Sequence, residues 1–161
     1  MSESSALLST IGAHLGAKLA GSVRLEESGA LIVTVGPNDL RDTARFIHEG
    51  LDARFVISVG TDCRPSGRGF RVDHIFSQDR RKTWIVLRAF TAAEDPKVPF
   101  ITPEVRAAAW AEREFRDLLG IGIDGHPDPR RLVLADDWPE GIYPLRRDVP
   151  YNIHPEPVTG Q

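Results

Sequence analysis

The sequence predicts an α+β fold: a small, mostly antiparallel sheet with helices packed on one face, followed by a long, extended, proline-rich C-terminal segment. Helix-like and strand-like segments follow one another in the order α-β-β-α-β-β-β, with short turns between consecutive strands, which is typical of antiparallel pairing. Prolines then recur from Pro127 to Pro150 and again at Pro155 and Pro157, so the end of the chain must be largely extended. We therefore assign residues 1–120 to an α+β domain and residues 121–161 to an extended segment.

The chain is expected to open with a helix and a hairpin. Ser4 or Ser5 can cap a helix that Gly21 would end. Its apolar residues repeat at helical spacing and are Leu8, Ile11, Leu15 and Leu19. Strands over 23–26 and 30–35, joined by Glu-Ser-Gly, form the predicted hairpin because apolar residues alternate in the second strand.

A second helix and three longer strands complete the predicted sheet. The helix is expected to begin at Pro37, and its apolar stripe continues to Leu51. Alternating apolar residues then predict strands over 54–60, 70–77 and 83–90. Turns at 67–69 and 78–80 separate them, which favours antiparallel neighbours.

A third helix is predicted from Thr102, which would cap it, to Gly120, which would end it. At about 100° per residue it has two distinct faces. The apolar face carries Ala108, Ala111, Phe115, Leu118 and Leu119. The opposite face carries Trp110, Arg113, Glu114 and Asp117. That second face is either solvated, with weak intrahelical ion pairs, or buried against a partner; the second interpretation is favoured because interfaces are enriched in Trp and Arg.

Composition narrows the classes of function. The 161 residues carry a net charge of −3, which gives no support to a nucleic-acid partner, and no apolar run approaches the roughly 20 residues that a membrane-spanning helix needs. The sequence opens without the basic region of a signal peptide, so we expect the chain to face the cytosol. Cys63 is the single cysteine and the five histidines are far apart, which argues against an iron–sulfur cluster or a zinc site held by this chain alone.

A catalytic site is the less favoured alternative. Carboxylates and one histidine of the right types for a metal hydrolase lie near one another in sequence: Glu112, Glu114, His126, Asp136 and Asp137. However, residues 112 and 114 would point about 160° apart on a helix. Gly120-Ile121-Gly122 resembles part of a nucleotide-binding loop but follows a helix rather than a strand. A free-standing enzyme and a soluble adaptor outside redox metabolism remain the rival classes.

Charged residues between Ala111 and Asp148 alternate with large apolar ones. Arg130-Arg131 followed by Asp136-Asp137, and then Arg146-Arg147-Asp148, are predicted to form matched ion pairs, because arginine forms bidentate pairs with carboxylates at interfaces. A solvated charge run is the alternative. After about residue 124 there is little periodicity beyond a possible short strand over 131–134, so we expect this segment to be disordered in the free protein and ordered in a complex.

These residues carry a resemblance to a known family. Glu112-Arg113-Glu114, Asp117-Leu118-Leu119, His126 and Arg130-Arg131-Leu132 stand in the spacing of the signature of the complex I 30 kDa family, the C-type subunits in the peripheral arm of NADH:quinone oxidoreductase. Gly125-His126-Pro127-Asp128, Asp136-Asp137-Trp138 and the residues from Pro144 to Asp148 extend the match. The resemblance covers most of the chain from about Leu31.

One departure from the respiratory form is informative. Between Trp138 and Pro144 the chain has Pro-Glu-Gly-Ile-Tyr, a longer linker than that form is expected to have. In this respect the sequence looks more like the homologous domain of membrane-bound, energy-converting nickel–iron hydrogenases and formate hydrogenlyase-type complexes. The resemblance therefore implies a subunit of a complex I-like oxidoreductase, with the hydrogenase type favoured and the 30 kDa subunit of a true NADH:quinone oxidoreductase (respiratory complex I) as the alternative.

The resemblance also implies a role, which is to fix the geometry of neighbouring subunits. Members of the family bind no cofactor themselves; iron–sulfur clusters and a nickel–iron or quinone site belong to their partners. Those partners are the large subunit with the quinone or nickel–iron site and the iron–sulfur subunit, on the cytoplasmic face of the membrane, with membrane contact only through the complex. We predict no catalytic, cofactor-binding or metal-binding residue. The predicted interface residues are Trp110, Arg113, Glu114, Asp117, His126, Arg130, Arg131, Asp136, Asp137, Trp138, Arg146 and Arg147.

Overall fold

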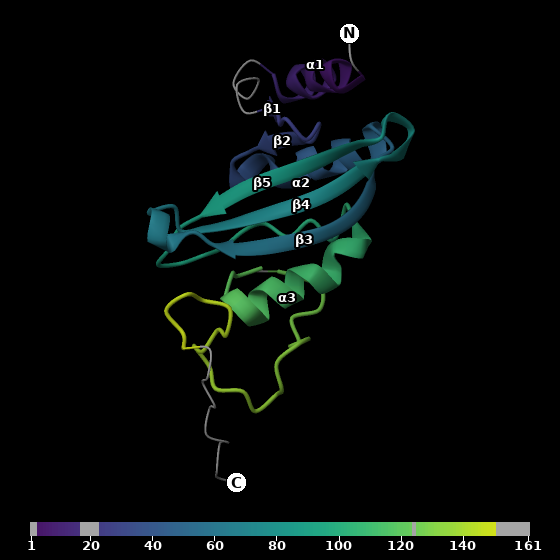
Figure 1. Cartoon of the computed structure of the whole chain (residues 1–161). Helices are drawn as coiled ribbons and strands as arrows, with labels where there is room; N and C mark the ends of the chain where they lie inside the picture. The colour runs from purple at the N-terminus through teal and green to yellow at the C-terminus, as the bar shows by residue number, and fades with distance from the viewer. Residues whose placement is uncertain (1–2, 17–22, 124, 151–161) are drawn as a thin grey trace.

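The computed structural model of the chain (Figure 1) describes residues 3–16, 23–123 and 125–150. In chain order the elements are α1 (Glu3–Leu15), β1 (Val23–Leu25), β2 (Leu31–Thr34), α2 (Pro37–Arg45) with the π-helical turn η2 (Phe46–Gly50), β3 (Arg54–Asp62), η3 (Arg64–Ser66), β4 (Phe70–Gln78), η4 (Asp79–Arg81), β5 (Thr83–Thr91), η5 (Arg106–Ala108) and α3 (Ala109–Leu119). The predicted α+β class is confirmed.

The five described strands form one mixed sheet in the order β1-β2-β5-β4-β3. The β1–β2, β3–β4 and β4–β5 pairs are antiparallel, as the short turns predict, whereas β2 and β5 run parallel. The parallel pair arises because the chain leaves the sheet after β2 through α2 and adds the β3–β4 hairpin before β5 returns beside β2. Strands β3, β4 and β5 have nine residues each and dominate the sheet.

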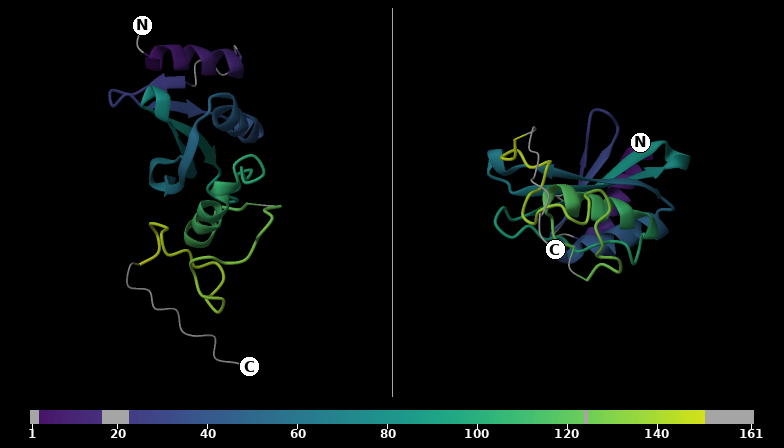
Figure 2. Two further views of the ribbon diagram at one scale, coloured as in Figure 1. Left: turned by 90° about the vertical axis from the view of Figure 1, so that its right-hand side faces the viewer. Right: turned by 90° about the horizontal axis from the view of Figure 1, so that it is seen from below.

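One face of the sheet is apolar and carries the helices. Alternate residues of β4 and β5 are buried on this face, among them Phe76 and Leu87. Residues of all three α-helices and of η2 join the same core: Leu7, Ile11, Leu40, Ala44, Ile47, Phe115 and Leu119. Figure 1 looks onto the other face, so α2 lies behind the strands and α3 lies beside β3. The left view of Figure 2 places α1 and the yellow residues that end at Pro150 at opposite ends of the molecule.

Gly60 sets how closely α3 approaches β3. A Cβ atom at this position would lie 2.5 Å from Leu119 Cδ1 and 2.9 Å from Phe115 Cβ, closer than Cβ contacts occur in proteins. The missing side chain therefore lets the helix settle against the edge strand. This close packing fixes the position of the charged residues on the other sides of α3.

Two predicted helix boundaries differ from the structure. Helix α1 ends at Leu15, where Gly16 takes a φ of +72°, and the predicted end at Gly21 lies outside the described residues. Helix α3 begins at Ala109 rather than Thr102. The hydroxyl of Thr102 donates to Glu112 instead of capping a helix, and a tight turn closed on the carbonyl of Ile101 follows it. The predicted end of α3 at Gly120, with a φ of +69°, is confirmed.

Residues 125–150, here called the C-terminal strap, follow α3 and pass beneath it in Figure 1. The possible short strand over 131–134 is not formed. Backbone N–H groups of this stretch donate to a side chain of α3 instead of to a neighbouring strand. The strap is thus organised by α3 rather than by the sheet.

Candidate interaction surface on α3 and the C-terminal strap

A carboxylate, a hydroxyl and an imidazole meet at the start of α3. Glu112 is fully buried; its Oε1 accepts the N–H of Ile101 at 2.5 Å and its Oε2 accepts the hydroxyl of Thr102 at 2.5 Å. Nε2 of His126, from the strap, lies 3.5 Å from the same Oε2. We call Thr102, Glu112 and His126 the buried clasp, because they join three segments of the chain.

The clasp is buried, and this determines its electrostatics. Burial raises the pKa of Glu112 above its ordinary range, and hydrogen bonds from Thr102 and from the N–H of Ile101 oppose that rise. Phe100 packs edge-on against the His126 ring, with 5.6 Å between centroids. The clasp therefore holds a carboxylate with neutral donors and an imidazole rather than with a guanidinium.

The clasp brings together one carboxylate and one imidazole. In the part of the chain that the structure describes, no three His, Cys, Asp or Glu side chains are grouped closely enough to hold a metal ion. Of the five residues weighed for a hydrolase, only Glu112 and His126 come together; Glu114, Asp136 and Asp137 are exposed. No helix within the described residues is long and apolar enough to cross a membrane.

Arg113 holds the first half of the strap against α3. Its guanidinium donates to the carbonyl oxygens of Arg130 and Arg131, both at 2.9 Å, and to Asp128 Oδ2 at 2.9 Å. Asp128 also receives two bonds from the Arg130 side chain at 2.8 Å, which hold the pKa of this carboxyl well below its usual range. The strap buries Arg113, and all three guanidinium nitrogens of this residue donate to strap residues.

Asp117 organises the next turn of the strap. Its Oδ2 accepts the backbone N–H groups of Leu132, Val133 and Leu134 at 2.7, 3.0 and 3.5 Å. The three converging amides supply hydrogen bonds to a buried carboxylate. The second buried face predicted for the third helix therefore exists at Arg113 and Asp117, but the strap of the same chain covers it.

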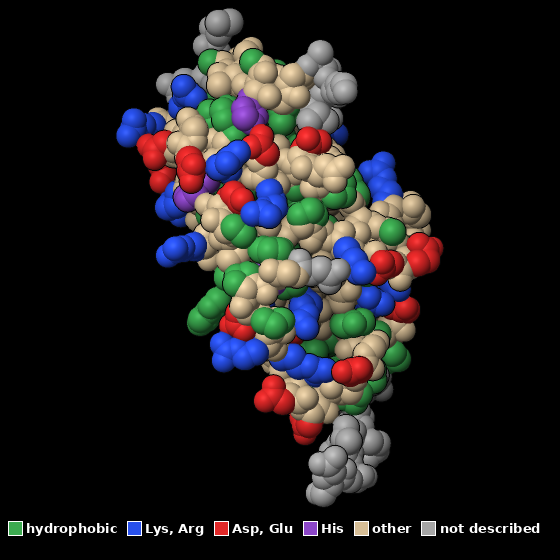
Figure 3. All heavy atoms as spheres, turned by 180° about the vertical axis from the view of Figure 1, so that it is seen from behind, with side chains coloured by type: hydrophobic (Ala, Val, Ile, Leu, Met, Phe, Trp, Pro, Cys, Tyr) green, Lys and Arg blue, Asp and Glu red, His purple; other side chains and the backbone are tan. Residues whose placement is uncertain are grey.

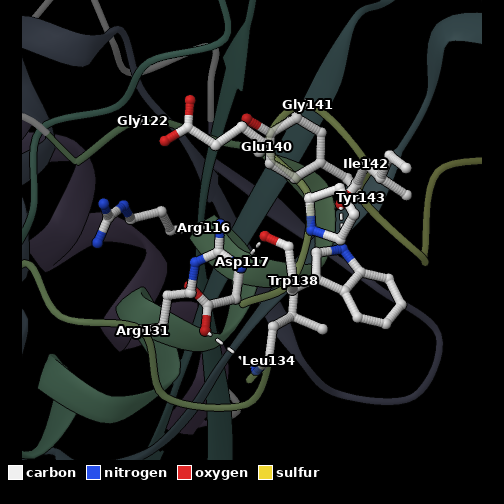
Figure 4. Close-up of a pocket in the computed structure, with 12 residues that line it drawn as sticks. Arg116, Asp117, Gly122, Arg131, Leu134, Trp138, Glu140, Gly141, Ile142 and Tyr143 are labelled. Carbon is white, nitrogen blue, oxygen red and sulfur yellow. Dashed lines mark hydrogen bonds between the residues drawn. The ribbon is translucent and has the colours of Figure 1, made fainter. Parts of the chain in front are cut away.

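Arg131 and Trp138 shape an open pocket between α3 and the strap (Figure 4). Nη1 of Arg131 donates to the carbonyl oxygens of Ala135 at 3.1 Å and of Trp138 at 2.7 Å, and the Trp138 indole donates to the carbonyl of Ile142 at 2.9 Å. The pocket measures about 290 Å³, and its lining includes the longer linker from Pro139 to Tyr143. These bonds close the strap into a loop of fixed shape.

Arg146 fastens the end of that loop to the C-terminus of α3. Its Nε donates to the carbonyl of Leu119 at 2.7 Å, and its guanidinium lies 4.3 Å from the centre of the Tyr143 ring and 5.1 Å from that of Phe70. A Cβ atom at Gly120 would lie 2.5 Å from the Tyr143 ring. Glycine is required there both for its positive φ and for this close approach.

A second carboxylate site, missed at the sequence level, holds the last part of the strap to the edge of the sheet. Arg64 donates to Asp62 at 2.9 and 2.7 Å and to Asp148 at 3.0 and 2.6 Å, while Asp62 Oδ2 also accepts the N–H of Arg147 at 2.9 Å. We call Asp62, Arg64 and Asp148 the surface clamp, in which Asp62 is buried and Asp148 is exposed. The Arg64 guanidinium holds the pKa of Asp62 well below its usual range.

The predicted ion pairs within the strap are partly wrong. Arg130 pairs with Asp128 instead of with Asp136 or Asp137, and Arg131 caps carbonyl oxygens instead of pairing with an acid. Asp148 does pair, but with Arg64 just beyond the end of β3 rather than with its neighbours. Complementary charges lie close together in the sequence, but the path of the strap decides which of them meet in the fold.

The remaining predicted interface residues lie on the outside of this assembly. Trp110 is 71% exposed, and Glu114, Asp136, Asp137 and Arg147 are exposed as well. Figure 3 shows the side opposite to Figure 1, where basic and hydrophobic side chains alternate toward the end that holds α3 and the strap. The buried contacts made by Arg113, Asp117 and His126 hold the strap in position. The exposed residues are accessible to a partner.

Comparison with known proteins gives a consistent result. Residues 33–155 match the family described as respiratory-chain NADH dehydrogenase, 30 Kd subunit. The chain is 40% identical over 129 residues to hydrogenase-4 component G of Escherichia coli (strain K12) and 40% identical over 131 residues to formate hydrogenlyase subunit 5 of the same strain. These matches cover 79% and 80% of the chain but 23% of each relative, so the chain spans about a quarter of their length.

A further relative is covered much more completely. The C-type subunit of NADH-quinone oxidoreductase from Mesorhizobium japonicum (strain LMG 29417 / CECT 9101 / MAFF 303099) is 34% identical over 150 residues, which is 90% of the chain and 73% of that protein. Among solved structures, a chain of the membrane-bound sulfane sulfur reductase, an archaeal respiratory membrane complex, matches with a TM-score of 0.73 and 17% identity over 92% of this chain and 86% of that one. The trypsin-resistant fragment of Nqo5 matches with a TM-score of 0.61 and 24% identity over 77% and 97%. The two structural matches show the fold.

Proposed function

Because the chain belongs to the respiratory-chain NADH dehydrogenase 30 Kd subunit family, we propose that it is a non-catalytic peripheral-arm subunit of a complex I-like, membrane-bound oxidoreductase. In this role it positions the large subunit with the quinone or nickel–iron site relative to the iron–sulfur subunit. It binds no cofactor itself, and it reaches the cytoplasmic face of the membrane only through the complex. Electron-transfer distances in the partners then depend on the rigidity of this chain.

The observation that carries this proposal is the combination of a firmly held strap with exposed apolar side chains. Trp110, Val133 and Leu145 are 71%, 53% and 59% exposed. They stand on a backbone that the buried clasp, Asp117 and the surface clamp hold in place. Large apolar side chains on a rigid backbone are typical of a surface that receives another protein.

The hydrogenase type is favoured within this proposal. Over comparable lengths the chain is 40% identical to the two E. coli relatives and 34% identical to the Mesorhizobium protein. The Pro139–Tyr143 linker, which lines the pocket beside α3, supports the same assignment. In that case the neighbouring subunits carry a nickel–iron site.

The 30 kDa subunit of an NADH:quinone oxidoreductase is the second candidate. The broad match to the Mesorhizobium protein, which extends over 73% of its length, favours it. Deleting the gene for this chain in its source cells and assaying membranes separates the two. Loss of hydrogen evolution with intact NADH-dependent quinone reduction supports the hydrogenase type, and the reverse supports the respiratory type.

The structural role itself is tested by purification through a tag on this chain. We expect a detergent-solubilised complex that contains iron, and nickel if the hydrogenase type is correct, in its other subunits. Trp110→Ser should lower the yield of assembled complex, whereas Leu25→Ser, at a 39% exposed position on β1, should not. A chain that purifies alone and carries out a redox or hydrolytic reaction by itself would contradict the proposal.

A further inference from the structure

The face of the sheet opposite the helices carries a second surface. Directly paired residues point to the same side of a sheet, so the strand register identifies its rows. One row is Ile57, Ile75 and Val86 across β3, β4 and β5, and the next row contains Val59 opposite Asp73. Figure 1 looks onto this face, and no described helix covers it.

Apolar side chains are exposed together on this face. Ile57, Val59 and Trp84 are 43%, 41% and 49% exposed, and Val86 beside them is half-buried. Single exposed apolar residues are common, but adjacent ones on neighbouring strands form a continuous patch, which marks a contact site. We call Ile57, Val59, Ile75, Trp84, Val86 and Phe90 the outer sheet face.

Cations border the outer sheet face. Asp73 pairs with Arg88 at 2.7 Å and with Arg71 at 3.1 Å, so one carboxylate serves two guanidiniums. The Arg68 guanidinium lies 5.8 Å from the centre of the Phe90 ring, and no described carboxylate lies within ion-pair distance of it. Glu26, whose charge acts on Arg88, is itself paired with Arg24. The border therefore carries an excess of two positive charges.

We propose that the outer sheet face docks a second protein partner through an apolar surface bordered by Asp and Glu side chains. An apolar partner surface covers the exposed rows, and its carboxylates meet the two uncompensated guanidiniums. A second copy of this chain is disfavoured, because it would bring the same excess of positive charge to the contact. The inference rests on the proposed function, since it gives the chain one partner at α3 and the strap and another at the sheet, which is what a positioning role requires.

The three tryptophans of the chain report on separate surfaces, with Trp84 on the outer sheet face, Trp110 on α3 and Trp138 at the pocket. Hydroxyl-radical oxidation, read by mass spectrometry, is compared between the free full-length chain and the complex purified through it. We expect the oxidation of Trp84 to fall several-fold in the complex. If Trp110 is protected and Trp84 remains as reactive as in the free chain, the inference is overturned and the proposed function stands. If the chain purifies without partners, the proposed function itself fails.

Charge and self-association complete the test. Arg68→Glu should weaken retention of the chain in the complex about tenfold and make it more sensitive to salt. Arg45→Glu is the matched control, because Arg45 is also exposed but lies on α2, behind the sheet. Equal effects of the two variants would overturn the acidic border of the partner. Protection of Trp84 in the free chain that increases with its concentration would identify a second copy as the occupant and overturn the inference.

Discussion

The buried clasp and the surface clamp both hold the C-terminal strap, and both are centred on a carboxylate. The clasp surrounds the buried Glu112 with a hydroxyl, an amide and an imidazole, whereas the clamp pairs Asp62 with a guanidinium at the edge of the sheet. Burial raises the pKa of Glu112, and the hydrogen bond from Arg64 lowers that of Asp62. Neutral hydrogen-bond donors therefore hold the carboxylate of Glu112, whereas a guanidinium holds the carboxylate of Asp62.

This difference decides what each site tolerates. The buried carboxylate of Glu112 depends on every donor around it, because a buried polar group without a partner costs its full desolvation. Asp62 in the clamp is buried as well but has a guanidinium partner, and the clamp's other carboxylate, Asp148, is exposed and can return to water when its pair is broken. Substitutions should therefore separate the two sites first by magnitude and then by pH dependence.

Glu112→Ala should produce the largest loss. It leaves the N–H of Ile101, the hydroxyl of Thr102 and His126 without their shared acceptor, so we expect the free energy of unfolding to fall by about 3–5 kcal/mol in urea titrations. Glu114→Ala is the matched control: it is two residues away and exposed, and should change stability by no more than about 0.5 kcal/mol. Equal losses for the two variants would show that the clasp is not a structural site.

Asp117→Ala should have an intermediate effect. The variant frees three strap amides from their acceptor, and we expect a loss of about 1–3 kcal/mol with faster hydrogen exchange at Leu132, Val133 and Leu134. Asp136→Ala, in an exposed part of the same strap, serves as the control. Exchange rates that stay unchanged in Asp117→Ala would mean that other contacts order this turn. The same measurement on the unmodified free chain tests the prediction that the strap is disordered without its partners.

The alternation of apolar residues was sufficient to predict the strands, since a strand with one buried face shows a period of two. The strand order and the parallel β2–β5 pair were not predicted, because they depend on how the chain crosses over through α2. The end of α3 was also predictable, because Gly120 is a residue type that ends helices. Its start was not. Thr102-Pro103-Glu104 is a capping pattern, but here the threonine hydroxyl serves Glu112 and the helix begins only at Ala109.

The candidate site was predictable in its residues and not in its contacts. The alternation of charged and apolar residues indicated that Arg113 and Asp117 are covered, yet sequence cannot tell a partner's surface from a later part of the same chain. The roles of Asp62 and Arg64 could not be predicted from sequence patterns, because Asp62 contacts Arg147, which is 85 positions away in the sequence. Which exposed residues touch other subunits stays a prediction.

The pH dependence of stability should differ in sign between the two sites. The lowered pKa of Asp62 adds stability above its unfolded value of about 3.9, and that stability is lost as the pH falls from this value toward the lower folded pKa. The raised pKa of Glu112 has the opposite effect: ionisation reduces stability as the pH rises from its unfolded value of about 4.3 toward the folded one. Urea titrations across this range should show Asp62→Asn losing less stability than the parent on acidification, and Glu112→Gln losing less than the parent as the pH rises. Profiles parallel to the parent would contradict the assignment.

Arg130→Ala should have the smallest effect on the stability of the free chain. We expect its effect to be seen only in the yield of assembled complex. The Arg130 side chain is 81% exposed, and its partner Asp128 keeps a second guanidinium, Arg113, at 2.9 Å, so no buried charge is left unpaired. The melting temperature should stay close to the parent's. Arg131→Ala removes two bonds to carbonyl oxygens of the strap and should lower the melting temperature more, which separates shaping of the surface from contact with a partner. If a partner covers Arg130, its own carboxylate loses a cation in the variant, and native gels should show less assembled complex while activity per assembled complex falls less. Full assembly with abolished turnover would assign Arg130 a direct part in the reaction, and unchanged assembly would place it outside the interface.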